Sequence, residues 1–61
     1  MDDTSTVERR MEVFAALVAA QDQGASVATS RHLIARRYGM PVEEVAQIES
    51  EGIEQQWPPL D

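Results

Sequence analysis

The spacing of apolar residues along the chain predicts three helices. The first pattern has intervals of four, three, three and one residues, which places its members along one side of a helix. These residues are Val7, Met11, Phe14, Leu17 and Val18. A shorter pattern follows within residues 31–38, and another begins after Pro41. We therefore expect an all-α protein with helices of unequal length.

The first helix is predicted to run from about Thr6 to Asp22. Ser5 and Glu8 have the spacing of a capping box, in which each side chain satisfies the backbone amide of the other. Residues 1–4 are polar and are interpreted as a frayed end. Gly24 suits the left-handed residue that closes a helix.

The start of the second helix is open to three interpretations, because Ser26, Thr29 and Ser30 can each serve as a cap. We favour Ser30, which predicts a short helix at Arg31–Tyr38. Its inward residues are expected to be Leu33, Ile34 and Tyr38, and its outward residues Arg31, His32, Arg36 and Arg37.

A break between two helices is predicted at Gly39-Met40-Pro41. Proline lacks an amide donor and disfavours the α conformation of the residue before it, so the chain has to turn at Met40. Gly39 tolerates the positive φ that such a turn needs. The third helix then starts at Pro41 and ends either at Glu51, before Gly52, or at Gln56.

These elements predict a single three-helix domain over residues 1–61 that contains a helix-turn-helix. Ala35 is small enough for close packing within the motif, and Val45 and Ile48 lie three residues apart in its second helix. The expected core combines one face of each helix: Phe14, Leu17, Val18, Leu33, Ile34, Tyr38, Val45 and Ile48.

Residues 34–53, IARRYGMPVEEVAQIESEGI, resemble the helix-turn-helix of region 4 of bacterial sigma-70-type RNA polymerase sigma factors. The resemblance implies a transcription-related protein that binds DNA or a promoter complex with RNA polymerase. Where the family interleaves arginines through the second helix of the motif, this chain has Val42, Glu44 and Ala46.

The resemblance also implies which residues meet DNA. The outward positions that enter the major groove are Val42, Glu43, Ala46, Gln47 and Ser50. Among them, a glutamate can accept from cytosine and a glutamine can pair with adenine. Arg31, Arg36 and Arg37 could touch phosphates or could instead offset the acidic third helix.

Charge favours an alternative function. The net charge is −6, whereas a basic face is the usual footprint of a DNA-binding protein. Residues 31–40 carry three arginines and no acid, and residues 41–61 carry six acids and no base. The alternative is a protein-interaction module that holds a basic partner through the acidic third helix or through the tail Trp57, Pro58, Pro59 and Leu60.

The tail itself has two interpretations. Its successive prolines favour a polyproline-II conformation over residues 57–61. Trp57 and Leu60 either fold back over the small core or dock a partner, and the first is favoured because a domain this short needs its large side chains.

The remaining composition narrows the function classes. The chain has no cysteine, no lysine and one histidine, His32, so we expect no enzyme activity, no cofactor and no metal site. It lacks an apolar run of about 20 residues and begins with acids, which predicts a cytoplasmic protein without a membrane segment. A homodimer is one candidate assembly, and the sequence leaves the oligomeric state open.

Overall fold

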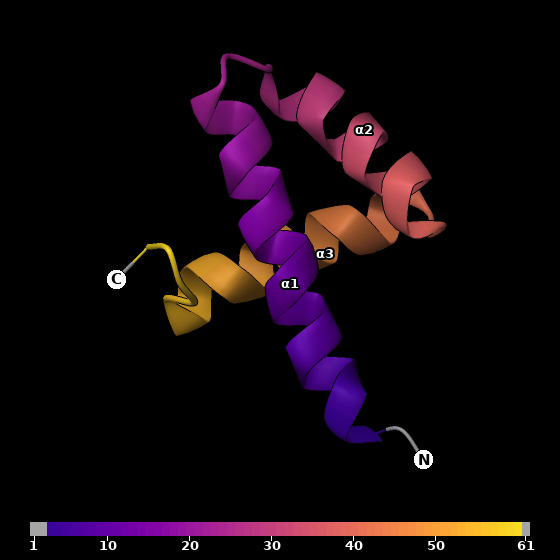
Figure 1. The fold of residues 1–61 in the computed structure, drawn as a ribbon, viewed down its shortest axis with the longest axis vertical. Coiled ribbons are helices and arrows are strands. Elements are labelled where there is room, and N and C mark those ends of the chain that lie inside the picture. Colours follow the sequence, from indigo (N-terminus) through magenta and orange to yellow (C-terminus); the bar gives the residue numbers. More distant parts are fainter. Residues whose placement is uncertain (1–2, 61) are drawn as a thin grey trace.

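The computed structural model describes the backbone of residues 3–60 and the side chains of residues 7–60. It contains three helices, α1 (Asp3–Asp22), α2 (Val27–Tyr38) and α3 (Val42–Gln55). Helix α1 is the longest, α2 folds back beside its C-terminal half, and α3 begins beside the C-terminal end of α2 and crosses behind α1 (Figure 1). The predicted all-α, three-helix fold is confirmed.

Helix α1 begins earlier than the sequence suggested. It starts at Asp3, so Ser5 lies inside the helix and is not its N-cap. No proline or glycine interrupts residues 3–6, so the sequence allows the helix to begin there. The predicted frayed end is therefore wrong for residues 3 and 4, while Met1 and Asp2 lie outside the described residues.

The preferred start of α2 was also wrong, because the cap is Ser26. The Ser26 hydroxyl accepts a hydrogen bond from the Thr29 amide at 3.1 Å, and its backbone is extended, as an N-cap requires. Ser30 instead lies one turn inside the helix, fully buried, and donates to the Val27 carbonyl at 2.8 Å. This local bond satisfies the hydroxyl within the helix.

The predicted turn between α2 and α3 is confirmed. Gly39 closes α2 in the left-handed conformation, with φ 67° and ψ 42°. Its amide and that of Met40 both donate to the Ala35 carbonyl, a typical helix C-terminal closure. Pro41 is the N-cap of α3, so the helix starts one residue later than predicted.

We expect Gly39→Val to lower the free energy of unfolding by about 1–3 kcal/mol, the usual cost of a strained backbone conformation. No atom lies within 4 Å of a Cβ built at Gly39, so the loss would come from the positive φ alone. Thermal melting followed by circular dichroism measures it. Gly39→Asn is the control, since asparagine tolerates this conformation. Equal melting of the valine variant and the parent would contradict the turn.

The buried core draws on all three helices. Its apolar members are Val13, Phe14, Leu17, Ile34, Ala35, Val45 and Ile48. Val18 and Tyr38 are only partly buried against it, and Leu33 is 50% exposed, so the prediction of a buried Leu33 is wrong. Val13 is fully buried, although the predicted apolar stripe did not include it, and both α2 and α3 contact α1.

Gly52 explains why α3 does not stop at Glu51. The residue is buried, and a Cβ built on it would lie 2.2 Å from the Cδ1 atom of Phe14. Glycine therefore lets the α3 backbone approach the aromatic ring, and the helix continues to Gln55. Gln56 then closes the helix with a positive φ of 56°. Of the two predicted ends, the later one is close to the observed boundary.

The tail returns towards the core through Trp57. The Trp57 and Phe14 rings form an edge-to-face pair with centroids 6.0 Å apart. Beyond it the Leu60 amide donates to the Trp57 carbonyl at 2.9 Å, which makes a turn in place of the predicted polyproline-II segment. Leu60 remains 48% exposed. The expectation of a covering role is thus confirmed for Trp57 and wrong for Leu60.

Candidate interaction face of the helix-turn-helix

Helix α3 divides into a buried side and an exposed side. Val45, Ile48 and Gly52, at intervals of three and four residues, face the core. The opposite side carries exposed polar residues at the complementary positions, Glu43, Gln47, Ser50 and Glu54. We call these four residues the outer face of α3.

The predicted DNA-contacting positions fall into two groups. Glu43, Gln47 and Ser50 are exposed on the outer face, where another macromolecule can reach them. Val42 is partly buried against the core, and Ala46 is half-buried at the edge of the outer face. Of the five positions predicted on α3, only Glu43, Gln47 and Ser50 are therefore exposed, and they form one row of polar side chains.

The arginines also separate into two groups. Arg31 forms an ion pair with Glu49, with Nε 2.8 Å from Oε1, and Arg10 pairs with Glu51. The first pair joins α2 to α3 and the second joins α1 to α3, beside the buried side of α3. Arg36 and Arg37 are exposed, and neither takes part in the described ion pairs. Of the two roles considered for Arg31, offsetting the acidic helix is the one it has in this structure.

A polar cluster that the sequence reading did not identify ties the three helices together. The Gln21 side chain on α1 donates to the Ser30 hydroxyl at 3.1 Å and to Glu49 Oε2 at 3.3 Å. Glu49 also accepts from Arg31 and is 13% exposed. The sequence could have indicated this position of Ser30, because Ser30 and Ile34 are four residues apart and therefore lie on the same, inward side of α2.

A second missed contact surrounds Tyr38 at the end of α2. The guanidinium carbons of Arg9 and Arg37 lie 5.2 and 5.9 Å from the centre of its ring, within the range of cation–π attraction. Its hydroxyl lies 3.5 Å from Glu12 Oε2. This contact links α2 to the N-terminal half of α1 and holds Arg37 towards α1.

Arg36 occupies a different place, beside the turn. It lines a shallow hollow together with His32 on α2 and Val42 at the start of α3. An exposed guanidinium at this position lies next to the N-terminal end of α3, from which its outer face begins. Arg36 is therefore the predicted phosphate-contacting residue best placed to act together with α3.

The charge of α3 remains acidic after these pairs are counted. Glu49 and Glu51 have arginine partners, whereas Glu43, Glu44 and Glu54 are exposed outside the described ion pairs. Helix α3 contains no basic residue. Its outer face therefore presents negative charge together with the amide of Gln47 and the hydroxyl of Ser50.

In the part of the chain that the structure describes, no group of three or more histidine, cysteine, aspartate or glutamate side chains could hold a metal ion. None of the described helices is both long and apolar enough to cross a membrane.

No protein-family model, no curated protein and no solved structure matches this chain.

Proposed function

We propose that this chain is a small transcription-related helix-turn-helix protein that acts on DNA or on a promoter complex with RNA polymerase. The observation that supports the proposal is the arrangement of α2, the Gly39 turn and α3. It leaves Glu43, Gln47 and Ser50 in one exposed row while the opposite side of α3 is buried. An exposed polar helix held by a rigid partner helix is the element that enters a major groove.

The chemistry of the row fits base edges. Gln47 can donate and accept towards adenine, Glu43 can accept from the amino group of cytosine, and Ser50 can bond to several bases. Arg36, beside the first turn of α3, would contact a phosphate and fix the register of the helix.

Electrostatics would keep this binding weak. Phosphate contacts supply most of the sequence-independent affinity, and the pairing of Arg10 and Arg31 with α3 glutamates leaves few cations for them. A net charge of −6 adds repulsion. We therefore propose that the protein acts as a dimer or alongside RNA polymerase, where additional contacts hold it on DNA.

A second candidate is a module that binds a basic protein partner. The specific observation that favours it is the exposed carboxylates of Glu43, Glu44 and Glu54 on a helix without a base. Such a surface attracts lysine- or arginine-rich segments and repels nucleic acid. The Trp57–Leu60 tail contributes to it only through the exposed Pro58, Pro59 and Leu60, because Trp57 packs on Phe14.

A charge-placement experiment distinguishes the two candidates. Ser50→Arg adds a cation on the outer face, and Gln55→Arg adds the same charge at an exposed position on another side of α3. If α3 enters DNA, Ser50→Arg should bind duplex DNA more tightly and steepen the salt dependence by about 0.9 in log–log slope for one new phosphate contact. Gln55→Arg should change both quantities much less.

Binding is measured by fluorescence anisotropy across a salt series that begins at about 0.01 M, where the Debye length is about 30 Å. Gln47→Ala should reduce the preference for one base pair and leave binding to mixed sequences nearly unchanged. No DNA binding by the parent at the lowest salt, or equal gains from both arginine variants, would contradict contact through α3. Absence of DNA binding together with capture of a basic peptide would favour the second candidate.

A further inference from the structure

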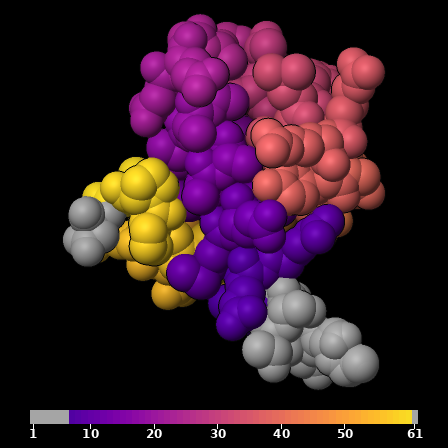
Figure 2. Space-filling view, in the orientation of Figure 1, coloured from indigo at the N-terminus to yellow at the C-terminus, as the bar shows by residue number. Residues whose placement is uncertain are grey.

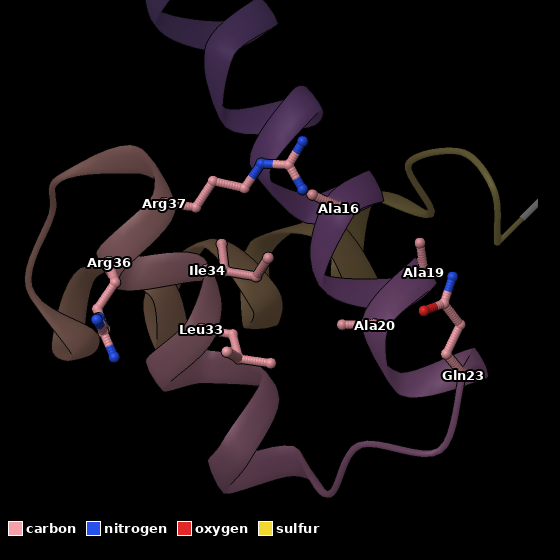
Figure 3. Close-up of a pocket in the computed structure, with 8 residues that line it drawn as sticks. All are labelled: Ala16, Ala19, Ala20, Gln23, Leu33, Ile34, Arg36 and Arg37. Carbon is pink, nitrogen blue, oxygen red and sulfur yellow. The ribbon is translucent and has the colours of Figure 1, made fainter.

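An open groove lies between α1 and α2, and no residue of α3 lines it. Its volume is about 590 Å³. Ala16, Ala19 and Ala20 line it from α1, and Leu33 and Ile34 line it from α2 (Figure 3). Residues 23–26 connect the two helices, which diverge from there (Figure 1). In the space-filling view the atoms of α1 and α2 lie next to each other (Figure 2). The groove is separate from the outer face of α3.

The walls of the groove are apolar and its one charged end is positive. Leu33 is a large apolar residue that stays 50% exposed here. Arg37 extends towards Ala16, and Arg36 stands at the same end with its guanidinium directed away (Figure 3). Gln23 lines the other end, and no carboxylate is among the lining residues. The surface therefore combines an apolar floor with unbalanced positive charge.

We propose that this groove binds an amphipathic, acidic helix of a partner protein. The alanines present little side-chain bulk, so a helix can approach α1 closely while its apolar residues contact Leu33. Residues 16–22 of α1 span about 9 Å, nearly two helical turns, which matches one short helix. Glutamates or aspartates flanking the apolar stripe of that helix would pair with Arg37.

The properties of the groove favour an acidic helix over two other occupants, a nucleic acid and a second copy of this chain. A nucleic acid would find few hydrogen-bond donors on a floor of alanine and leucine, although phosphates could reach the arginines at the rim. A second copy would have to offer α3 as the acidic helix, but the apolar side of α3 is already buried in its own core.

The expected affinity is modest. Two turns of helix bury much less than the roughly 1,600 Å² of a standard interface, and the binding helix loses conformational entropy. We therefore expect dissociation constants in the high micromolar range for an isolated peptide. Salt should weaken binding, because Arg37 is exposed at one end of the groove.

The probe is a synthetic helix of about 14 residues, four turns, with leucines at positions i, i+3, i+4 and i+7, glutamates elsewhere, and a hydrocarbon staple on its solvent side. Titration into the full chain labelled with ¹⁵N should shift the amide signals of Ala19, Ala20, Leu33 and Arg37. Leu33→Asp and Arg37→Glu should each weaken binding at least tenfold. Val27→Asp is the matched control, since Val27 is 48% exposed on the same helix but outside the groove.

A second peptide with lysines in place of the glutamates tests the charge argument and should bind at least tenfold more weakly. Equal binding of the two peptides would overturn the proposal, as would no shift at groove residues up to millimolar peptide. Sedimentation that shows a concentration-dependent dimer, lost in Leu33→Asp, would assign the groove to a second copy. Shifts of the same amides by duplex DNA, with none by the acidic peptide, would assign it to nucleic acid.

Discussion

Gly52→Ala is expected to lower the free energy of unfolding by about 2 kcal/mol, within the usual cost of overpacking a core. On helix propensity alone, alanine should stabilise the interior of α3 by roughly 1 kcal/mol. The new methyl, however, would lie 2.2–2.6 Å from three atoms of the Phe14 ring. That ring is 1% exposed and contacts Trp57, so it has little room to move. Chemical denaturation followed by circular dichroism gives the difference.

Two further variants isolate the cause of that loss. Ser50→Ala, at an exposed position of the same helix, should leave stability unchanged or raise it slightly. In a Phe14→Leu background the ring is absent, so adding Gly52→Ala should cost much less than in the parent. A double-mutant cycle measures this coupling. Additive effects of the two substitutions would show that α3 does not pass Phe14 at Gly52.

Ile48→Ala is expected to cost about 2–5 kcal/mol, the range for emptying a well-packed core position. Ile48 is fully buried and lies between the two other inward residues of α3, Val45 and Gly52. A domain of this size commonly has only about 3–5 kcal/mol of stability. The variant should therefore be largely unfolded at room temperature, with a loss of far-ultraviolet helical signal.

The same helix supplies a matched control. Ile53→Ala removes the same atoms from a side chain that is 57% exposed, and alanine has the higher helix propensity. It should melt close to the parent. Val18→Ala should have an intermediate effect, since Val18 is only partly buried. Similar melting of the Ile48 and Ile53 variants would contradict the orientation of α3.

The sequence was most informative where backbone chemistry constrained the chain. Gly39 and Pro41 together allow few conformations, and both the turn and the division between α2 and α3 follow from them. The inward residues Val45 and Ile48 were likewise predictable. In a short helix that is buried on one side only, the spacing of the apolar residues defines a single inward face.

Helix starts were less predictable because several residues compete as caps. Ser26 and Ser30 have the same capping chemistry, and the burial of Ser30 among Gln21 and Glu49 depends on the placement of all three helices. Leu33 was predicted to face inward together with Ile34 and Tyr38. In the structure it is 50% exposed on the wall of the open groove between α1 and α2, a placement that an apolar pattern does not specify.

The candidate site likewise has features that the sequence could predict and features that it could not. The exposed row of Glu43, Gln47 and Ser50 follows from helix phase, so it could be predicted once the core side of α3 was known. The pairing of Arg31 with Glu49 could not, because the sequence allowed Arg31 a role either towards DNA or towards α3. The role of Gly52 depended on a contact with Phe14, 38 positions earlier in the chain, that no local pattern reports.

Residue-resolved mapping of DNA binding tests the central claim most directly. Duplex DNA is titrated into the ¹⁵N-labelled chain at about 0.01 M salt, where charge attraction is least screened. If the outer face of α3 is the contact surface, the largest shifts should fall on the amides of Glu43, Gln47 and Ser50, with a smaller one at Arg36. Leu33 and the alanines of the groove should not move. Shifts confined to α1 and α2, or no shift at any residue, would contradict the proposal that α3 contacts DNA.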